Sequence, residues 1–171
     1  MRIADVLGKV EKSKDFRKLK KENPEFYLAH AFTMIDENEK KGAWELGFYS
    51  PERDRLAVFE TEPKVRLKSE DEVFKQEGIV KPLDVKKIKV SFQKAMELCD
   101  ELLKSKYSAQ TVTKRIVIIQ SLERPMYNVT LVTRSFSILN IKIDCQTGEV
   151  ISDNLQSLMK LGTWEKGGRE R

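Results

Sequence analysis

The sequence predicts an α+β protein of two tandem α-β-β-β units, each with one helix packed on an antiparallel β-meander. Three observations lead to this prediction. Apolar residues alternate with a period of two in several short segments, helical apolar patterns precede these segments, and the order of elements occurs twice. The expected boundaries are 1–63 for the first unit, 64–89 for a connecting segment, 90–161 for the second unit and 162–171 for a tail.

The clearest strand pattern lies between Met126 and Ile151. Two trios of apolar residues have a spacing of two, which places each trio on one face of a strand. The trios are Tyr127, Val129, Leu131 and Leu139, Ile141, Ile143. The polar residues 133–135 can reverse the chain between them, and Gly148 can supply the positive φ of a tight turn. We therefore expect a β-meander with one apolar face, which another element must cover.

A helix upstream of this meander is predicted to cover it. Apolar residues follow the helical spacing i, i+3, i+4, i+7, i+10, i+11. They are Phe92, Ala95, Met96, Cys99, Leu102 and Leu103. Ser91 is a suitable N-cap, because its hydroxyl can accept a hydrogen bond from an otherwise unpaired amide. A strand over 111–122 then joins the helix to the meander.

The first half repeats this order of elements. A helix is expected over 3–22, ended by Pro24, because the residue before a proline is pushed out of the helical region. A strand follows over 26–35 and two more over 44–48 and 56–62. In the first strand one face is expected to carry five larger side chains, namely Phe26, Leu28, His30, Phe32 and Met34.

The two halves also match in the positions of their apolar residues. Five residues of the first half lie at a constant offset of 83 from five residues of the second. They are Trp44, Leu46, Phe48, Leu56 and Val58, against Tyr127, Val129, Leu131, Leu139 and Ile141. The similarity is one of pattern and not of residue identity, and it favours a repeated plan.

Regular structure is less clearly indicated outside these patterns. In the connecting segment we expect a short helix near Ser69–Gln76 and an extended piece near Ile88, since a connection this long usually carries short elements of its own. After Ile151, the spacing of Leu155, Leu158 and Leu161 favours a last helical turn or two over 154–161.

The second half resembles a PepSY domain, a small module found in propeptides of secreted metallopeptidases. The resemblance covers about Val90–Ser152 and depends on three features: the Ala- and Leu-containing helix, the aromatic Tyr127 that begins a strand, and the segment Ile143–Val150, similar to a hydrophobic-Asp-x-x-Thr-Gly-Glu-Val hairpin. It implies a PepSY-like or cystatin-like fold, a helix packed on an antiparallel sheet, and a role in binding or inhibiting protein. It implies no catalytic residues.

Composition limits the classes of protein that remain. The chain has 171 residues, 40% of them hydrophobic, and no apolar run approaches the roughly 18 residues of a membrane helix. We identify no signal peptide at the N-terminus. The two cysteines, Cys99 and Cys145, have no metal or redox spacing and are expected to be free thiols. A cytoplasmic location without membrane attachment is therefore expected.

The search for catalytic chemistry gives no candidate residues. His30, the single histidine, lies in an apolar strand without the partners that metal or triad chemistry requires. The acidic pairs lie beside lysines, as on a solvated helix surface, and the glycines form no phosphate-binding loop. We therefore predict a non-catalytic protein without a cofactor or a metal.

Two kinds of macromolecular partner remain, and a small ligand between helix and sheet is also left open. The favoured one is a protein partner, or a second copy of the chain, bound by strand addition at a sheet edge. Tyr49, Phe59 and Trp164 are the candidate partner contacts. The alternative is weak nucleic-acid association, which the net charge of +5 and the basic first helix favour. Its candidate patch consists of Lys9, Lys12 and Arg17.

Overall fold

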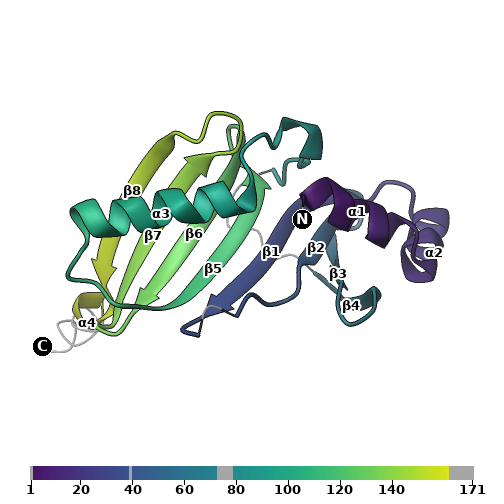
Figure 1. Cartoon of the computed structure of the whole chain (residues 1–171). Helices are drawn as coiled ribbons and strands as arrows, with labels where there is room; N and C mark the ends of the chain where they lie inside the picture. The colour runs from purple at the N-terminus through teal and green to yellow at the C-terminus, as the bar shows by residue number, and fades with distance from the viewer. Residues whose placement is uncertain (1, 39, 73–78, 162–171) are drawn as a thin grey trace, which may run out of the picture.

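The chain forms one continuous eight-stranded antiparallel sheet with helices on one face (Figure 1). The computed structural model describes residues 2–38, 40–72 and 79–161. The strand order is β4-β3-β2-β1-β5-β6-β7-β8, so each half of the chain is a meander and the two halves join at the antiparallel pair β1–β5. The strands are β1 (Tyr27–Asp36), β2 (Glu45–Ser50), β3 (Arg55–Glu60), β4 (Arg66–Glu72), β5 (Val112–Ser121), β6 (Pro125–Thr133), β7 (Ser137–Asp144) and β8 (Val150–Ser157).

The helical elements lie against both halves of the sheet. They are α1 (Ile3–Glu11), α2 (Lys14–Glu22), the 3-10 turn η1 (Val85–Lys87), α3 (Phe92–Lys106) and α4 (Leu158–Leu161). Figure 1 shows α3 across the strands of the second half and α1 and α2 beside those of the first half. The α+β class expected from the sequence is therefore confirmed.

One apolar core lies between the helices and the sheet. The strand register places Leu46, Ala31, Ile119 and Tyr127 side by side on the same face, and all four are buried. The ring of Phe16 from α2 lies 4.8 Å from that of Phe48 on this face. Because the same face is buried across the junction β1–β5, both halves contribute to one core.

The clearest sequence patterns form the elements that were expected of them. The predicted helix from Phe92 is α3, and the hydroxyl of its N-cap Ser91 accepts a hydrogen bond from the Lys94 amide at 3.1 Å. The trios of the central stretch lie in β6 and β7 and are fully buried. Gly148 has a φ of 78°, so the turn uses the conformation that glycine adopts without strain.

The single helix expected over 3–22 is wrong, because the chain forms two helices there. Ser13 has an extended backbone, with φ of −71° and ψ of 152°, and acts as the N-cap of α2. Its hydroxyl accepts a hydrogen bond from the Phe16 amide at 3.2 Å. The break gives each helix its own direction, so that Ile3, Val6 and Val10 of α1 and Phe16 of α2 all reach the core.

The expected apolar face of the first strand is also wrong beyond Leu28. A register shift between Leu28 and His30 moves the following residues by one position, which exchanges the two faces of the strand. Ala31 and Thr33 therefore point into the core and are fully buried. His30 and the larger residues Phe32 and Met34 lie on the opposite face, which the described helices do not cover, and Met34 is exposed.

Both outermost strands differ from the sequence prediction. The helix expected near Ser69–Gln76 is wrong as far as Glu72, because β4 occupies Arg66–Glu72; residues 73–76 lie outside the described part of the chain. The helix expected over 154–161 is wrong for its first half, since β8 runs to Ser157 and only Leu158–Leu161 is helical. The extended piece near Ile88 is confirmed by its backbone angles. The segment expected to be a connection thus contributes a strand to the sheet.

Candidate protein-interaction surface

The strand β8 is one of the two free edges of the sheet, and exposed apolar side chains gather along it and at its C-terminal end. Of the nine exposed large hydrophobic residues in the described part of the chain, five belong to this region. They are Ile151 and Leu155 on β8, Leu158 and Met159 in α4, and Phe136 before β7. We call these five residues, together with the outer backbone of β8, the β8 surface. The amide of Leu158 donates to the carbonyl of Phe136 at 2.8 Å, which fixes α4 beside the start of β7.

The register of β8 shows which of its amides are available to another strand. Hydrogen-bonded and non-hydrogen-bonded pairs alternate in an antiparallel ladder. The hydrogen bond from Leu158 to Phe136 therefore sets the phase, and the pair Leu139–Leu155 falls at a non-bonded position. The amides and carbonyls of Asp153, Leu155 and Ser157 consequently point away from β7. Within the described residues no strand lies on that side.

The opposite edge of the sheet, β4, is protected by charge. Five of its seven residues are charged, namely Arg66, Lys68, Glu70, Asp71 and Glu72. Arg66 forms an ion pair with Glu60 of β3 and Lys68 with Glu45 of β2. The amide of Leu67 donates to the carboxylate of Asp15 at 3.2 Å. Charged side chains of this kind are a common defence against unwanted strand pairing. β8, in contrast, carries a single charge.

That single charge of β8 faces the helix layer and is fully engaged. The carboxylate of Asp153 accepts hydrogen bonds from the Lys106 ammonium, at 2.6 Å, and from the Tyr107 hydroxyl. These hydrogen bonds, that of Lys106 first, hold the pKa of Asp153 below its usual value. The contact anchors β8 to the C-terminal end of α3, so the edge strand is held in place although it has one strand neighbour.

Two of the expected partner contacts are wrong, because their rings are buried. Tyr49 is 2% exposed, and its hydroxyl donates to the Asp54 carboxylate at 2.6 Å. Phe59 is fully buried against Phe16 and Phe48 in the core. Exposed apolar residues gather instead on the β8 surface. Trp164, the third expected contact, lies outside the described residues.

The structure brings together two of the three residues of the expected basic patch. Lys9 and Lys12 line a hollow of about 520 Å³ beside the junction of α1 and α2. Three further cations line the same hollow, namely Lys14, Lys64 and Arg66, with Asp15 as its acidic member. Arg17 lies on α2 and is exposed, but it does not line the hollow.

His30 occupies a structural position on the sheet face opposite the helices. Its ring lies directly over Gly47 of β2, where an added Cβ would be only 2.2 Å from the His30 Cε1 atom. Burial lowers the pKa of His30, and the nearby Glu45 carboxylate opposes this effect. In the described ranges no group of three or more His, Cys, Asp or Glu side chains could hold a metal ion.

The two cysteines are free and buried, as expected from their spacing. Cys99 lies on α3 and Cys145 directly follows β7. Burial raises the pKa of each thiol to about 12. Neither sulfur is therefore ionised near neutral pH, and the thiols serve as small apolar groups of the core.

Comparisons with known proteins show similarity of fold alone. No family model matches the chain, and no curated protein matches it. The crystal structure of a putative lipoprotein from Clostridium difficile 630 is similar, with a TM-score of 0.51, and covers 86% of this chain and 97% of that one. The two sequences are 12% identical. Among the described residues, no helix is both long and apolar enough to span a membrane.

Proposed function

We propose that this protein is a non-catalytic binding module whose partner is a protein, and that β8 is the strand that makes the contact. The partner adds an extended strand to β8 and covers the apolar side chains of the β8 surface. A second copy of the chain can supply that strand, giving a symmetric dimer. This is the binding mode in which backbone hydrogen bonds give affinity and alternate side chains give specificity.

The contrast between the two sheet edges carries this proposal. β4 has five charged residues and an amide occupied by Asp15, whereas β8 has outward-pointing amides and one engaged charge. Single exposed apolar residues are common on protein surfaces. Five in one region, next to a strand edge that no other described strand covers, are typical of an interaction site.

The proposal includes an evolutionary relation between the halves. In our interpretation the chain consists of two tandem units, each with helical structure followed by a four-stranded meander, and the second is PepSY-like. The first unit has two helices, α1 and α2, where the second has α3. The symmetric strand order about β1–β5 supports this. So does the position of the offset residues Trp44 and Tyr127, which are both buried: Trp44 directly precedes β2, and Tyr127 lies near the start of β6. The hairpin segment Ile143–Val150 contains the turn in which Asp144 accepts hydrogen bonds from the amides of Gln146 and Thr147.

Capture from a lysate of the source organism tests the proposal when substitutions at the two edges are compared. Leu155→Pro removes an outward-pointing amide without removing a hydrogen bond to β7, and Leu155→Ala keeps the amide but removes the side chain. Leu67→Ala is the matched control, because Leu67 is 37% exposed on β4 and Leu155 is 36% exposed on β8. We expect Leu155→Pro to lose the captured protein, Leu155→Ala to retain less of it, and Leu67→Ala to capture as much as the wild type.

Light scattering after size exclusion distinguishes a dimer from a complex with another protein. If wild type and Leu155→Pro have the same mass and capture the same proteins, β8 is not the contact strand. The samples are treated with nuclease throughout, so that capture through nucleic acid is removed.

Weak association with nucleic acid is the second candidate, and the hollow lined by Lys9 and Lys12 favours it. Five cationic side chains line one concave surface, which is more than the two residues of the predicted basic patch that lie there. Arg66 is already paired with Glu60 at 2.8 Å, which reduces the charge available to phosphates. Affinity for single-stranded RNA should fall steeply with salt and be lost in Lys12→Glu/Lys14→Glu. Absence of binding at low salt excludes this candidate.

A further inference from the structure

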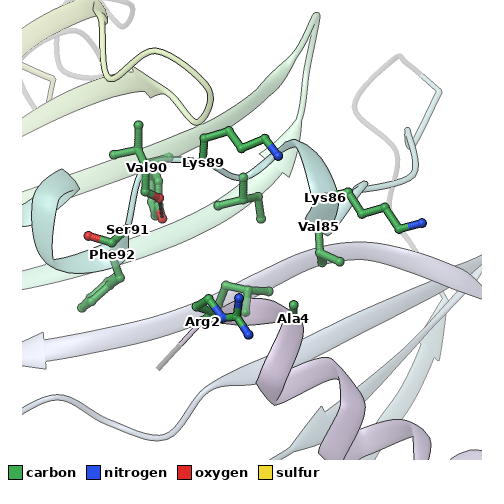
Figure 2. A pocket seen from close by; sticks show the side chains of 11 residues that line it. Arg2, Ala4, Val85, Lys86, Lys89, Val90, Ser91 and Phe92 are labelled. Carbon is green, nitrogen blue, oxygen red and sulfur yellow. Dashed lines mark hydrogen bonds between the residues drawn. The ribbon is translucent and has the colours of Figure 1, made fainter.

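A cavity of about 700 Å³ lies on the helix side of the sheet, where the two halves of the chain meet. Figure 2 shows Arg2 and Ala4 at the start of α1 on one side, and the segment from Val85 to Phe92 on the other. This segment consists of η1, an extended stretch and the first residue of α3. The volume lies within the range of small-molecule sites, about 300–1,000 Å³.

The wall formed by the extended stretch is fixed to the sheet by backbone hydrogen bonds. The amides of Lys89 and Val90 both donate to the Cys145 carbonyl, at 2.8 and 2.9 Å. The hydroxyl of Tyr127, which lines the cavity, donates to the Val90 carbonyl at 2.8 Å. These hydrogen bonds are internal to the protein and hold this wall in place, and a wall that is fixed in advance lowers the entropic cost of binding.

Most of the lining is apolar, while the charged lining residues are all cations. Ile3, Val85, Ile88 and Phe92 give hydrophobic walls. Arg2, Lys86 and Lys89 supply three positive charges, and no acidic residue is among the lining residues. Arg2 forms an ion pair with Asp5 at 3.2 Å, but neither Lys86 nor Lys89 forms an ion pair with any residue in the described ranges.

The backbone adds to this positive potential. Arg2, Ile3 and Ala4 are the N-cap and first residues of α1, and Ser91 and Phe92 those of α3. The N-terminus of a helix carries a partial positive charge from its unpaired amides. The cavity therefore combines apolar walls with a field that favours an anion.

We propose that this cavity binds a small organic anion with an apolar body, such as a carboxylate or a phosphate monoester of an aliphatic chain. The anionic group is held near Lys89 and Arg2, while Lys86, whose side chain points outward in Figure 2, adds positive charge at the edge of the cavity. The apolar body packs against Ile3, Ile88 and Phe92. This site is separate from β8 and does not depend on the proposed protein contact.

The fluorescence of Trp44 provides a direct readout. The Phe92 ring, which lines the cavity, lies 5.2 Å from the Trp44 ring in an edge-to-face contact. The chain has one other tryptophan, Trp164, so Trp164→Phe leaves Trp44 as the single reporter. Octanoate and octyl phosphate serve as probes, and isothermal calorimetry gives an independent measure of the same binding.

Charge controls separate recognition of the anion from simple apolar partition. Octanol and octylammonium have the same chain without the negative charge, and inorganic phosphate has the charge without the chain. We expect saturable binding of octanoate or octyl phosphate, at least about tenfold tighter than that of each control, and weaker binding at higher salt. The stronger of the two probes shows whether a carboxylate or a phosphate head is preferred.

Two neighbouring lysines provide a matched pair of variants. Lys86→Gln/Lys89→Gln should raise the Kd of the better probe by about five- to tenfold, as expected for two partly exposed charge pairs. Lys87→Gln changes the same charge in the same turn at a residue that does not line the cavity, and should leave the Kd within about twofold. Leu155→Pro should have no effect on it.

Three results would overturn the proposal. One is failure of both anionic probes to bind at millimolar concentration by fluorescence and calorimetry. The others are octanol binding as tightly as octanoate, and equal loss of affinity in Lys87→Gln and Lys86→Gln/Lys89→Gln. All the substituted lysines are exposed, so the variants should fold like the wild type.

Discussion

His30 of β1 and Gly47 of β2 lie opposite each other on adjacent strands, and the side chain of one depends on the size of the other. The His30 ring occupies the space that a Cβ at position 47 would need. We predict that Gly47→Ala lowers the free energy of unfolding by about 1–3 kcal/mol, as overpacking does. Urea denaturation of the variant measures this cost.

The matched control is the double variant His30→Ala/Gly47→Ala, in which the ring is absent. The double variant should be almost as stable as His30→Ala alone, so that most of the cost of Gly47→Ala disappears when the ring is absent. If the alanine costs as much without the ring as with it, the contact is not the cause.

Because His30 is the single histidine, its titration can be followed in the stability of the whole protein. Burial lowers its pKa in the folded state, so the unfolded state binds the proton more readily. Stability should therefore be fully present above the unfolded pKa of about 6.5 and decrease as the pH falls below it. Denaturation curves between pH 7.5 and 5.5 should show this slope, and His30→Gln should remove it. A slope that persists in His30→Gln would assign the effect to other groups.

The buried thiols of Cys99 and Cys145 should resist modification. With a pKa of about 12, each is almost entirely protonated at pH 8, and the thiolate is the reactive form. We predict that a disulfide reagent modifies the folded protein at least about a hundredfold more slowly than the protein in denaturant. Rapid reaction of one thiol under native conditions would contradict its burial.

At the scale of the elements, two serine caps determine where helices begin. Ser13 and Ser91 accept hydrogen bonds from the Phe16 and Lys94 amides. Substitution of either by alanine should cost about 1 kcal/mol of unfolding free energy. Ser105→Ala is the control, since that hydroxyl bonds to carbonyls within α3 and should cost less than about 0.5 kcal/mol. Equal losses at all three serines would show that the caps contribute nothing specific.

The elements also show which parts of the fold could be predicted from the sequence. α3 and the central meander have strong periodic patterns, because each has one buried face. β4 and β8 have no such pattern, since an edge strand is exposed along its outer side and needs few apolar residues. At Ser13, a local hydrogen bond starts a new helix with its own buried face. After Leu28, one extra residue in the strand exchanges its buried and exposed faces. The periodicity of the sequence reveals neither change.

The β8 surface could not be predicted from the sequence either, because its edge strand has no strong periodic pattern. Tyr49 and Phe59 are candidate contacts in the sequence, but Tyr49 packs against Tyr27 and Phe59 lies in the core, so both are buried. The residues of the β8 surface come from two elements and a turn, which the sequence alone does not bring together. A scarcity of charge in β8 was the one available signal.

At the scale of the whole molecule, the antiparallel pair β1–β5 joins two meanders into one sheet and leaves two outer edges of different chemistry. The charged β4 discourages pairing, whereas the outward amides of β8 have no strand partner among the described residues and lie next to apolar side chains. We propose that a protein partner, or a second copy of the chain, pairs with β8. Such pairing engages individual backbone amides and can be tested one amide at a time.

The most direct measurement is hydrogen–deuterium exchange of the free protein and of the complex that it forms with its captured partner or with itself. We predict that the amides of Asp153, Leu155 and Ser157 exchange readily in the free monomer and become protected in the complex, while those of β4 are unchanged. Protection confined to β4 or to the hollow around Lys12, with β8 exchanging as in the free protein, would contradict it.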